Sequence, residues 1–145
     1  MAIRSVMIVD DSEVDRYILK RLMKDAKAAS QFFEVDNGKE AIEFFQKYKG
    51  DAVDLPEGFP PALILLDINM PLMNGFEFLE CFQRLSAEEP GLDSAVVMMF
   101  SSSNNREDRE KALSYPCVKD YIVKMPESPD ELKAILCKTF PQCCA

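Results

Sequence analysis

The 145-residue sequence contains no histidine. A chain without histidine cannot be a histidine kinase or a histidine phosphotransfer protein, and it cannot hold a Ser-His-Asp or Cys-His catalytic pair. Any chemistry must therefore use carboxylates, hydroxyls and lysine. The five cysteines also lack paired CxxC spacing, so we expect reduced thiols rather than a zinc site.

Positive charge and long apolar runs are scarce as well. The chain has 17 Lys and Arg against 25 Asp and Glu, a net charge of −8. An acidic surface repels nucleic acid and anionic membranes, so neither is expected as a main ligand. The longest apolar run, Pro60 to Leu66, is too short to span a bilayer, and the N-terminus has no signal-peptide pattern. These features predict a cytoplasmic protein.

The length is that of one domain. A chain of this size buries roughly 70% of its unfolded surface and needs no disulfide or metal to hold a core. We expect residues 1–145 to form a single domain without an output domain, because only Pro141 to Ala145 follow the last expected helix.

Apolar, strand-like runs alternate with helix-period segments five times. Three of these runs are continuously apolar, which is typical of strands in a parallel sheet that is covered on both faces. The expected strands are Ile3–Val9, Gln31–Val35, Ala62–Leu66, Ala95–Phe100 and Val118–Val123. Five βα units in one short chain predict a doubly wound α/β domain.

Helix start signals stand between the strands. Four side chains lie three residues before a Glu, as in a capping box, and a fifth lies three residues before an Asp. These expected caps are Asn37, Asn74, Asn104, Ser128 and, opening the first helix, Ser12. The first two helices show apolar positions at helical spacing. They are Val14, Ile18, Leu22 and Ala26, then Ala41, Ile42, Phe45 and Tyr48.

Two connections are long, Tyr48 to Pro61 and Ser86 to Ser94. Both contain prolines and run from a helix into a strand. They are therefore expected to be surface loops, at the end of the sheet opposite the carboxyl ends of the strands.

Polar residues follow the strands at the other end, where open α/β sheets bind their ligands. Asp10 and Asp11 follow the first strand, Asp67 follows the third, Ser101 follows the fourth, and Lys124 lies near the end of the fifth. Two carboxylates about 4 Å apart repel by about 4 kcal/mol at an effective dielectric near 20, so three together demand a cation. Mg²⁺ suits them best, because it is commonly held by one or two carboxylates with waters and phosphate oxygens.

Beside a metal, one carboxylate can attack phosphorus and form an aspartyl phosphate. Asp67 is the best candidate, since it ends the most apolar strand and precedes the Ile68–Pro71 turn. Mg²⁺, Lys124 and Ser101 would neutralise the charge of the transferred group.

These residues carry a resemblance to a known family. From Ile3 to about Phe140 the sequence closely resembles the receiver domains of two-component response regulators, of the stand-alone, chemotaxis-regulator-like kind. Four motifs in order carry this resemblance, and together they are highly specific. They are Val9–Asp11, Leu65–Gly75, Ser101–Ser102 and Tyr121–Lys124.

The resemblance implies a flavodoxin-like fold, with five helices around a five-stranded parallel sheet of order 2-1-3-4-5. It also implies a phospho-acceptor switch that takes its phosphoryl group from a sensor histidine kinase or a phosphotransfer protein, and that signals to an unidentified downstream protein. Such a domain catalyses only its own phosphorylation and dephosphorylation. Two variants stay open: a phosphorelay intermediate, and a receiver-like binding module that is never phosphorylated.

The resemblance further implies a role for each site residue. Asp67 would be the phosphoacceptor, and Mg²⁺ would be bound by Asp11 and Asp67, by Asp10 mostly through water, and by the backbone carbonyl of Asn69. The phosphoryl group would meet the Lys124 ammonium and the Ser101 switch hydroxyl. Tyr121 would be the aromatic coupled to the switch, although a packed core tyrosine explains this residue equally well.

One position departs from the family pattern. Receiver domains usually have proline directly after the lysine, often with a cis peptide bond, whereas Met125 stands here between Lys124 and Pro126. A cis bond before a residue other than proline costs about 3 kcal/mol, which argues against a cis bond after Lys124.

Two other classes of protein with related chemistry or fold are less compatible with the residues. A haloacid-dehalogenase-type phosphatase needs a second Asp two residues after its nucleophile, and that position is Asn69. A flavodoxin-like FMN carrier must cradle a phosphate in its first loop, where Asp10 and Asp11 would repel it.

Overall fold

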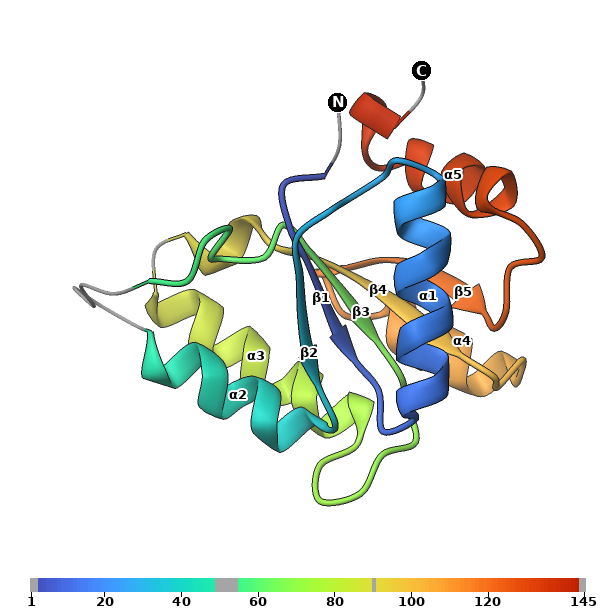
Figure 1. The fold of residues 1–145 in the computed structure, drawn as a ribbon. Helices are drawn as coiled ribbons and strands as arrows, with labels where there is room; N and C mark the ends of the chain where they lie inside the picture. The colour runs from blue at the N-terminus through green and yellow to red at the C-terminus, as the bar shows by residue number, and fades with distance from the viewer. Residues whose placement is uncertain (1–2, 49–54, 90, 144–145) are drawn as a thin grey trace.

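The computed structural model describes residues 3–48, 55–89 and 91–143. Within them, five parallel strands form one sheet of order β2-β1-β3-β4-β5, as predicted. The strands are β1 (Val6–Val9), β2 (Phe32–Val35), β3 (Leu63–Leu66), β4 (Val96–Ser101) and β5 (Val118–Val123). The helices are α1 (Glu13–Asp25), α2 (Gly38–Lys47), α3 (Gly75–Glu88), α4 (Arg106–Leu113) and α5 (Pro129–Cys137). Figure 1 shows α1 and α5 on one side of the sheet, and α2 and α3 on the other.

Alternate residues of the inner strands belong to two separate hydrophobic cores, one on each face of the sheet. In β1, Met7 and Val9 pack with α2, α3 and α4, whereas Val6 and Ile8 pack with α1 and α5. Apart from Ser101 at the end of β4, the inner strands are therefore apolar at every position, because both faces are covered. Fully burying one such side chain stabilises the fold by about 1.5–3 kcal/mol, so the buried strands hold the residues at their ends in place.

Four of the five predicted helix caps are confirmed. Ser12, Asn37, Asn74 and Ser128 each accept a hydrogen bond from the backbone amide three residues later. The prediction for α4 was wrong by one residue. The cap is Asn105, whose side chain accepts from the amides of Glu107 at 2.7 Å and Asp108 at 3.4 Å. Two donors reach Asn105, and this outweighs the spacing rule that had pointed to Asn104.

The apolar stripe predicted for α1 is partly wrong. Val14 and Ile18 are 66% and 38% exposed, and Leu19 and Met23 are the fully buried residues instead. Both sets repeat at helical spacing, so the pattern alone cannot choose between them. Packing against the sheet and α5 fixes the rotation of the helix, because Leu19 and Met23 lie in the same core as Val6 and Leu132. Lys20 also pairs with Glu34 of β2 at 2.8 Å. The stripe predicted for α2 is confirmed, since Ala41, Ile42 and Phe45 are buried.

The remaining segments bear on two expectations. Residues 49–54 of the predicted Tyr48–Pro61 loop lie outside the described residues, and the Ser86–Ser94 connection is shorter than predicted because α3 continues to Glu88.

Cys137 is disulfide-bonded, so the expectation of reduced thiols was wrong for this residue. The absence of CxxC spacing does not constrain a bond between cysteines that the fold brings together. Among the helices that the structure describes, none has the length and apolar character needed to cross a bilayer.

Candidate functional site

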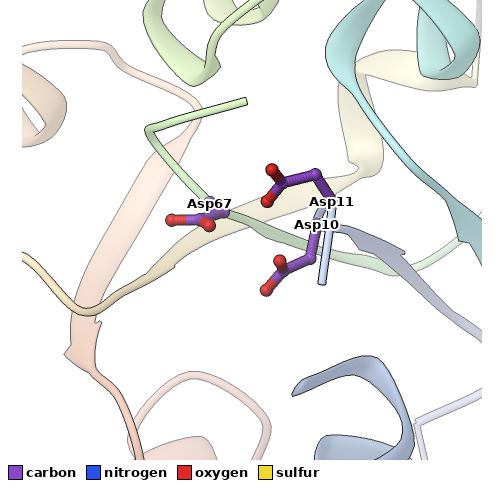
Figure 2. A group of neighbouring side chains, drawn as sticks. All are labelled: Asp10, Asp11 and Asp67. Atoms are coloured by element: carbon purple, nitrogen blue, oxygen red, sulfur yellow. The ribbon is translucent and has the colours of Figure 1, made fainter. Parts of the chain in front are cut away.

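The acidic residues after β1 and β3 are brought together by strand register. Val9 and Leu66 are partners in adjacent strands, so Asp10 and Asp67 follow side by side. Both are buried, at 2% and 8% exposure, while Asp11 points to solvent. One carboxylate oxygen from each of the three acids lies within 4.8 Å of the others. Figure 2 shows the three carboxylates projecting to the same side of the strand ends.

Lys124, the residue that follows β5, places a positive charge against this cluster. Its Nζ lies 2.5 Å from Oδ2 of Asp10, 2.9 Å from Oδ2 of Asp15 and 3.3 Å from Oδ2 of Asp67. The lysine backbone amide donates to the Ser101 carbonyl at 2.8 Å, which fixes the origin of the side chain at the end of β4. We call Asp10, Asp11, Asp67 and Lys124 the acidic centre.

Burial and pairing act in opposite directions on these groups. Burial raises the pKa of the Asp10 carboxyl, and the hydrogen bonds from Lys124 and the Ser12 amide only partly offset it. Burial also disfavours the charged form of Lys124, but the carboxylates of Asp10, Asp15 and Asp67 outweigh it and raise the pKa of the ammonium. Lys124 is therefore a permanent cation among carboxylates.

Backbone groups hold both buried acids in place. Oδ1 of Asp10 accepts from the Ser12 amide at 2.9 Å, and Oδ1 of Asp67 accepts from the Ile68 amide at 2.8 Å. The residue at position 75 must be glycine, because a Cβ on Gly75 would lie 2.4 Å from the carbonyl oxygen of Asp67. The start of α3 therefore packs directly on the backbone of the acid.

The other predicted site residues surround this centre. Ser101 is fully buried at the end of β4, where its hydroxyl accepts from the Ser103 amide at 3.2 Å. Tyr121 is 5% exposed and donates from its hydroxyl to the Ser103 carbonyl at 2.8 Å. Asn69 is exposed in the loop after Asp67. Ser101 and Tyr121 thus meet the same residue, Ser103.

The peptide bond between Lys124 and Met125 is cis, although its cost had argued against a cis bond there. The cost of a cis bond before a residue other than proline applies to a chain without tertiary contacts. In the folded protein Lys124 is held by three carboxylates and Met125 packs against the core between the sheet, α1 and α5, so the surroundings decide the geometry.

Sequence reasoning missed the contact between Asp15 and Lys124. Asp15 had been interpreted only as the acidic partner of the Ser12 cap, and its amide does donate to the Ser12 hydroxyl at 3.2 Å. Its carboxylate, however, turns toward the strand ends. An acid in the first helical turn after Asp10 and Asp11 was the signal that could have indicated this contact.

The donor set fits Mg²⁺. Asp10, Asp11 and Asp67 offer only carboxylate oxygens, which hard divalent ions prefer, and exposed Asp11 leaves one side open to water and to a phosphate group. The described residues around these oxygens include no thiol or imidazole that would favour a softer metal.

Comparison with known proteins agrees with this geometry. The two-component response regulator ORR1 of Oryza sativa subsp. indica is 31% identical over 96% of this chain and 57% of that protein. The chemotaxis protein CheY of Halobacterium salinarum is 26% identical over 91% of this chain and 93% of that protein. The chain spans about half the length of several curated relatives that it matches, ORR1 among them.

Solved structures agree as well. The crystal structure of a two-component response regulator from Cytophaga hutchinsonii is similar with a TM-score of 0.79 at 25% identity, covering 97% of this chain and 99% of that one. The Mn²⁺-bound form of the response regulator Rcp1 is similar with a TM-score of 0.69 at 25% identity, covering 94% and 92%. The family model of the response regulator receiver domain matches residues 6–136. The chain therefore belongs to the response regulator receiver domain family.

Proposed function

We propose that this chain is a phospho-acceptor switch in which Asp67 takes a phosphoryl group from a sensor histidine kinase or a histidine phosphotransfer protein. The observation that carries this proposal is the position of Asp67 at the end of β3, with a permanent cation 3.3 Å from one of its oxygens and two further carboxylates beside it. Family membership and the similarity to a Mn²⁺-bound response regulator support it.

In the proposed transfer, a carboxylate oxygen of Asp67 forms a bond to phosphorus as the bond from phosphorus to the donor nitrogen breaks. The electron pair of the broken bond stays on the leaving imidazole. Lys124 meets the negative charge on the phosphoryl oxygens, and the amide of Ile68 keeps the other oxygen of Asp67 in place. The chain's own part is thus to position the acid and to balance charge.

Asp10, Asp11 and Asp67 would hold Mg²⁺, with the backbone carbonyl of Asn69 as a further oxygen ligand. The ion would supply charge neutralisation at the transferred phosphoryl oxygens. The domain would catalyse only its own phosphorylation and dephosphorylation.

The signal would leave through a changed surface. A phosphoryl group on Asp67 is an acceptor that can draw the Ser101 hydroxyl away from the Ser103 amide. The Tyr121 hydroxyl donates to the carbonyl of Ser103, in the loop between β4 and α4. Movement of this loop would therefore change the orientation of the Tyr121 ring and the position of α4. A downstream protein that binds one arrangement more tightly would read the state.

The test is phosphorylation with a small donor. Incubation with phosphoramidate and Mg²⁺ should add the mass of one phosphoryl group to the wild type and none to Asp67→Asn. Chelating the metal should stop the reaction. The matched control is Asp93→Asn, an exposed acid at the opposite end of the sheet, which should be phosphorylated like the wild type. Modification of Asp67→Asn to the wild-type level would refute the assignment.

A further inference from the structure

Lys124 has a carboxylate partner that the proposed function does not use. Oδ2 of Asp15 lies 2.9 Å from Nζ, closer than the 3.3 Å of Asp67. Asp15 belongs to the first turn of α1, which contains none of the four residues of the acidic centre. The lysine side chain is 9% exposed and the Asp15 side chain 33%, so this pair is partly shielded from water.

The three contacts match the donor count of lysine. An ammonium has three N–H donors and no acceptor. In this structure Asp10, Asp15 and Asp67 each accept from Nζ. With two donors held by Asp10 and Asp15, the direction of the third is fixed, and it points to Asp67. Without Asp15, the ammonium could rotate about its last bond or turn to water.

We propose that Asp15 is a positioning residue, which holds the Lys124 ammonium so that its third donor faces the phosphoryl group on Asp67. This inference rests on the proposed function and deepens it. Asp15 does not touch the reacting atoms itself. It acts through Lys124 by restricting where the positive charge can lie, and transfer is sensitive to small displacements of such a charge.

The start of α1 is firmly held, so its carboxylate is a fixed anchor. Ser12 caps the Asp15 amide at 3.2 Å. The next residue, Arg16, donates to the carbonyl of Asp10 at 2.6 Å and pairs with Asp36 at 3.0 Å. Exposed ion pairs usually contribute little because both side chains are free to move. Here Arg16 attaches the start of the helix to the residues that follow β1 and β2. The Asp15 carboxylate is therefore less free to move than in an ordinary exposed ion pair.

A purely structural role is the competing explanation. An acid in the first turn of a helix interacts favourably with the helix dipole. Asp15→Asn separates the two roles, because the cap uses the backbone amide of Asp15 and survives the change. The dipole effect would alter only the stability of α1, whereas positioning would alter the phosphorylation rate through Lys124.

The experiment measures the initial rate of phosphorylation by phosphoramidate with saturating Mg²⁺. Asp15→Asn should be about tenfold slower than the wild type, the usual effect of losing a group that orients another active residue. Asp15→Glu keeps the charge and should recover most of the rate. Asp25→Asn, an exposed acid at the other end of the same helix, should match the wild type. A rate for Asp15→Asn within twofold of the wild type would overturn the proposal.

A double-mutant cycle then tests the route through Lys124. In a Lys124→Met background, adding Asp15→Asn should change the rate by less than twofold, since the positioned group is gone. An equal slowing in both backgrounds would overturn the proposal in favour of the structural role. Failure of the proposed function is distinguishable: it would appear as wild-type protein that gains no phosphoryl group, or gains it with Asp67→Asn.

Discussion

The acidic centre and helix α4 are held in opposite ways. Lys124, Asp10 and Asp67 are at most 10% exposed in their side chains and are joined by three short ionic contacts that include Asp15. Of the residues of α4, all of which are described, only Ala112 is buried. Polar contacts attach the helix instead: Arg109 donates to the Tyr121 carbonyl at 3.3 Å.

The difference shows how one small domain can combine rigid chemistry with a movable surface. Phosphoryl transfer needs fixed charges, and buried ionic contacts provide them. A helix with little buried apolar area can shift at low free-energy cost. The two regions meet at Ser103, which binds both Ser101 and Tyr121. Removing the buried cation of the centre should therefore cost much stability, and changes near α4 should cost little.

The largest expected effect comes from removing the central cation. Lys124→Met leaves Asp10 and Asp67 buried without their partner, and breaking a buried pair costs about 3–5 kcal/mol. Urea unfolding in the presence of a chelator should show a loss of this size. Mg²⁺ should stabilise the variant more than the wild type, because the ion would neutralise the same carboxylates.

The matched control for this change is Lys119→Met, at an exposed position of β5, which should stay within about 0.5 kcal/mol of the wild type. If both variants lost the same stability, the contrast between a tightly held centre and its surroundings would be wrong.

A smaller effect is expected at Asp11, the exposed member of the centre. Asp11→Asn should leave stability without metal nearly unchanged, because no buried pair is broken. It should weaken Mg²⁺ binding by about tenfold or more, equivalent to about 1.4 kcal/mol, since a direct carboxylate ligand is lost. Isothermal titration with Mg²⁺ measures this, with Asp25→Asn as the control. Equal affinity in Asp11→Asn and wild type would place the ion elsewhere.

The sequence predicted most of the fold and the convergence of the acidic centre. Continuous apolar runs predicted buried parallel strands, and parallel strands bring their carboxyl ends to one edge. The sequence alone therefore predicts that Asp10, Asp67 and Lys124 lie together. These predictions succeeded because backbone topology alone decides them.

Features that depend on tertiary contacts escaped prediction. The rotation of α1, which exposes Val14 and buries Leu19, follows from how the helix packs against the sheet and α5, which no local pattern encodes. The contact of Asp15 with Lys124 depends on that same rotation. The cis bond after Lys124 also runs against its local preference. Sequence patterns such as helical spacing describe one helix or strand at a time. These features depend instead on contacts between two or more elements.

The smallest expected effect probes the link between the two regions. Tyr121→Phe removes the hydrogen bond to the Ser103 carbonyl and should lower the free energy of unfolding by about 1 kcal/mol. Phosphorylation of Asp67 should proceed at nearly the wild-type rate, because the ring lies outside the acidic centre. Tyr115→Phe is the matched control, since it removes the hydroxyl that donates to Glu80 at 2.7 Å on the other side of α4.

The informative readout is amide hydrogen exchange with and without beryllofluoride, a mimic of the phosphoryl group. In the wild type, we expect the largest differences between residues 101 and 124, because Ser101, Ser103, α4 and Tyr121 lie on one connected route. In Tyr121→Phe the differences over α4 should shrink while those at Ser101 persist, since the mimic still binds but its effect is no longer passed on. Tyr115→Phe should keep the wild-type pattern. Unchanged exchange over α4 in the wild type, or an undiminished response in Tyr121→Phe, would show that the acidic centre reaches its partner surface by another route.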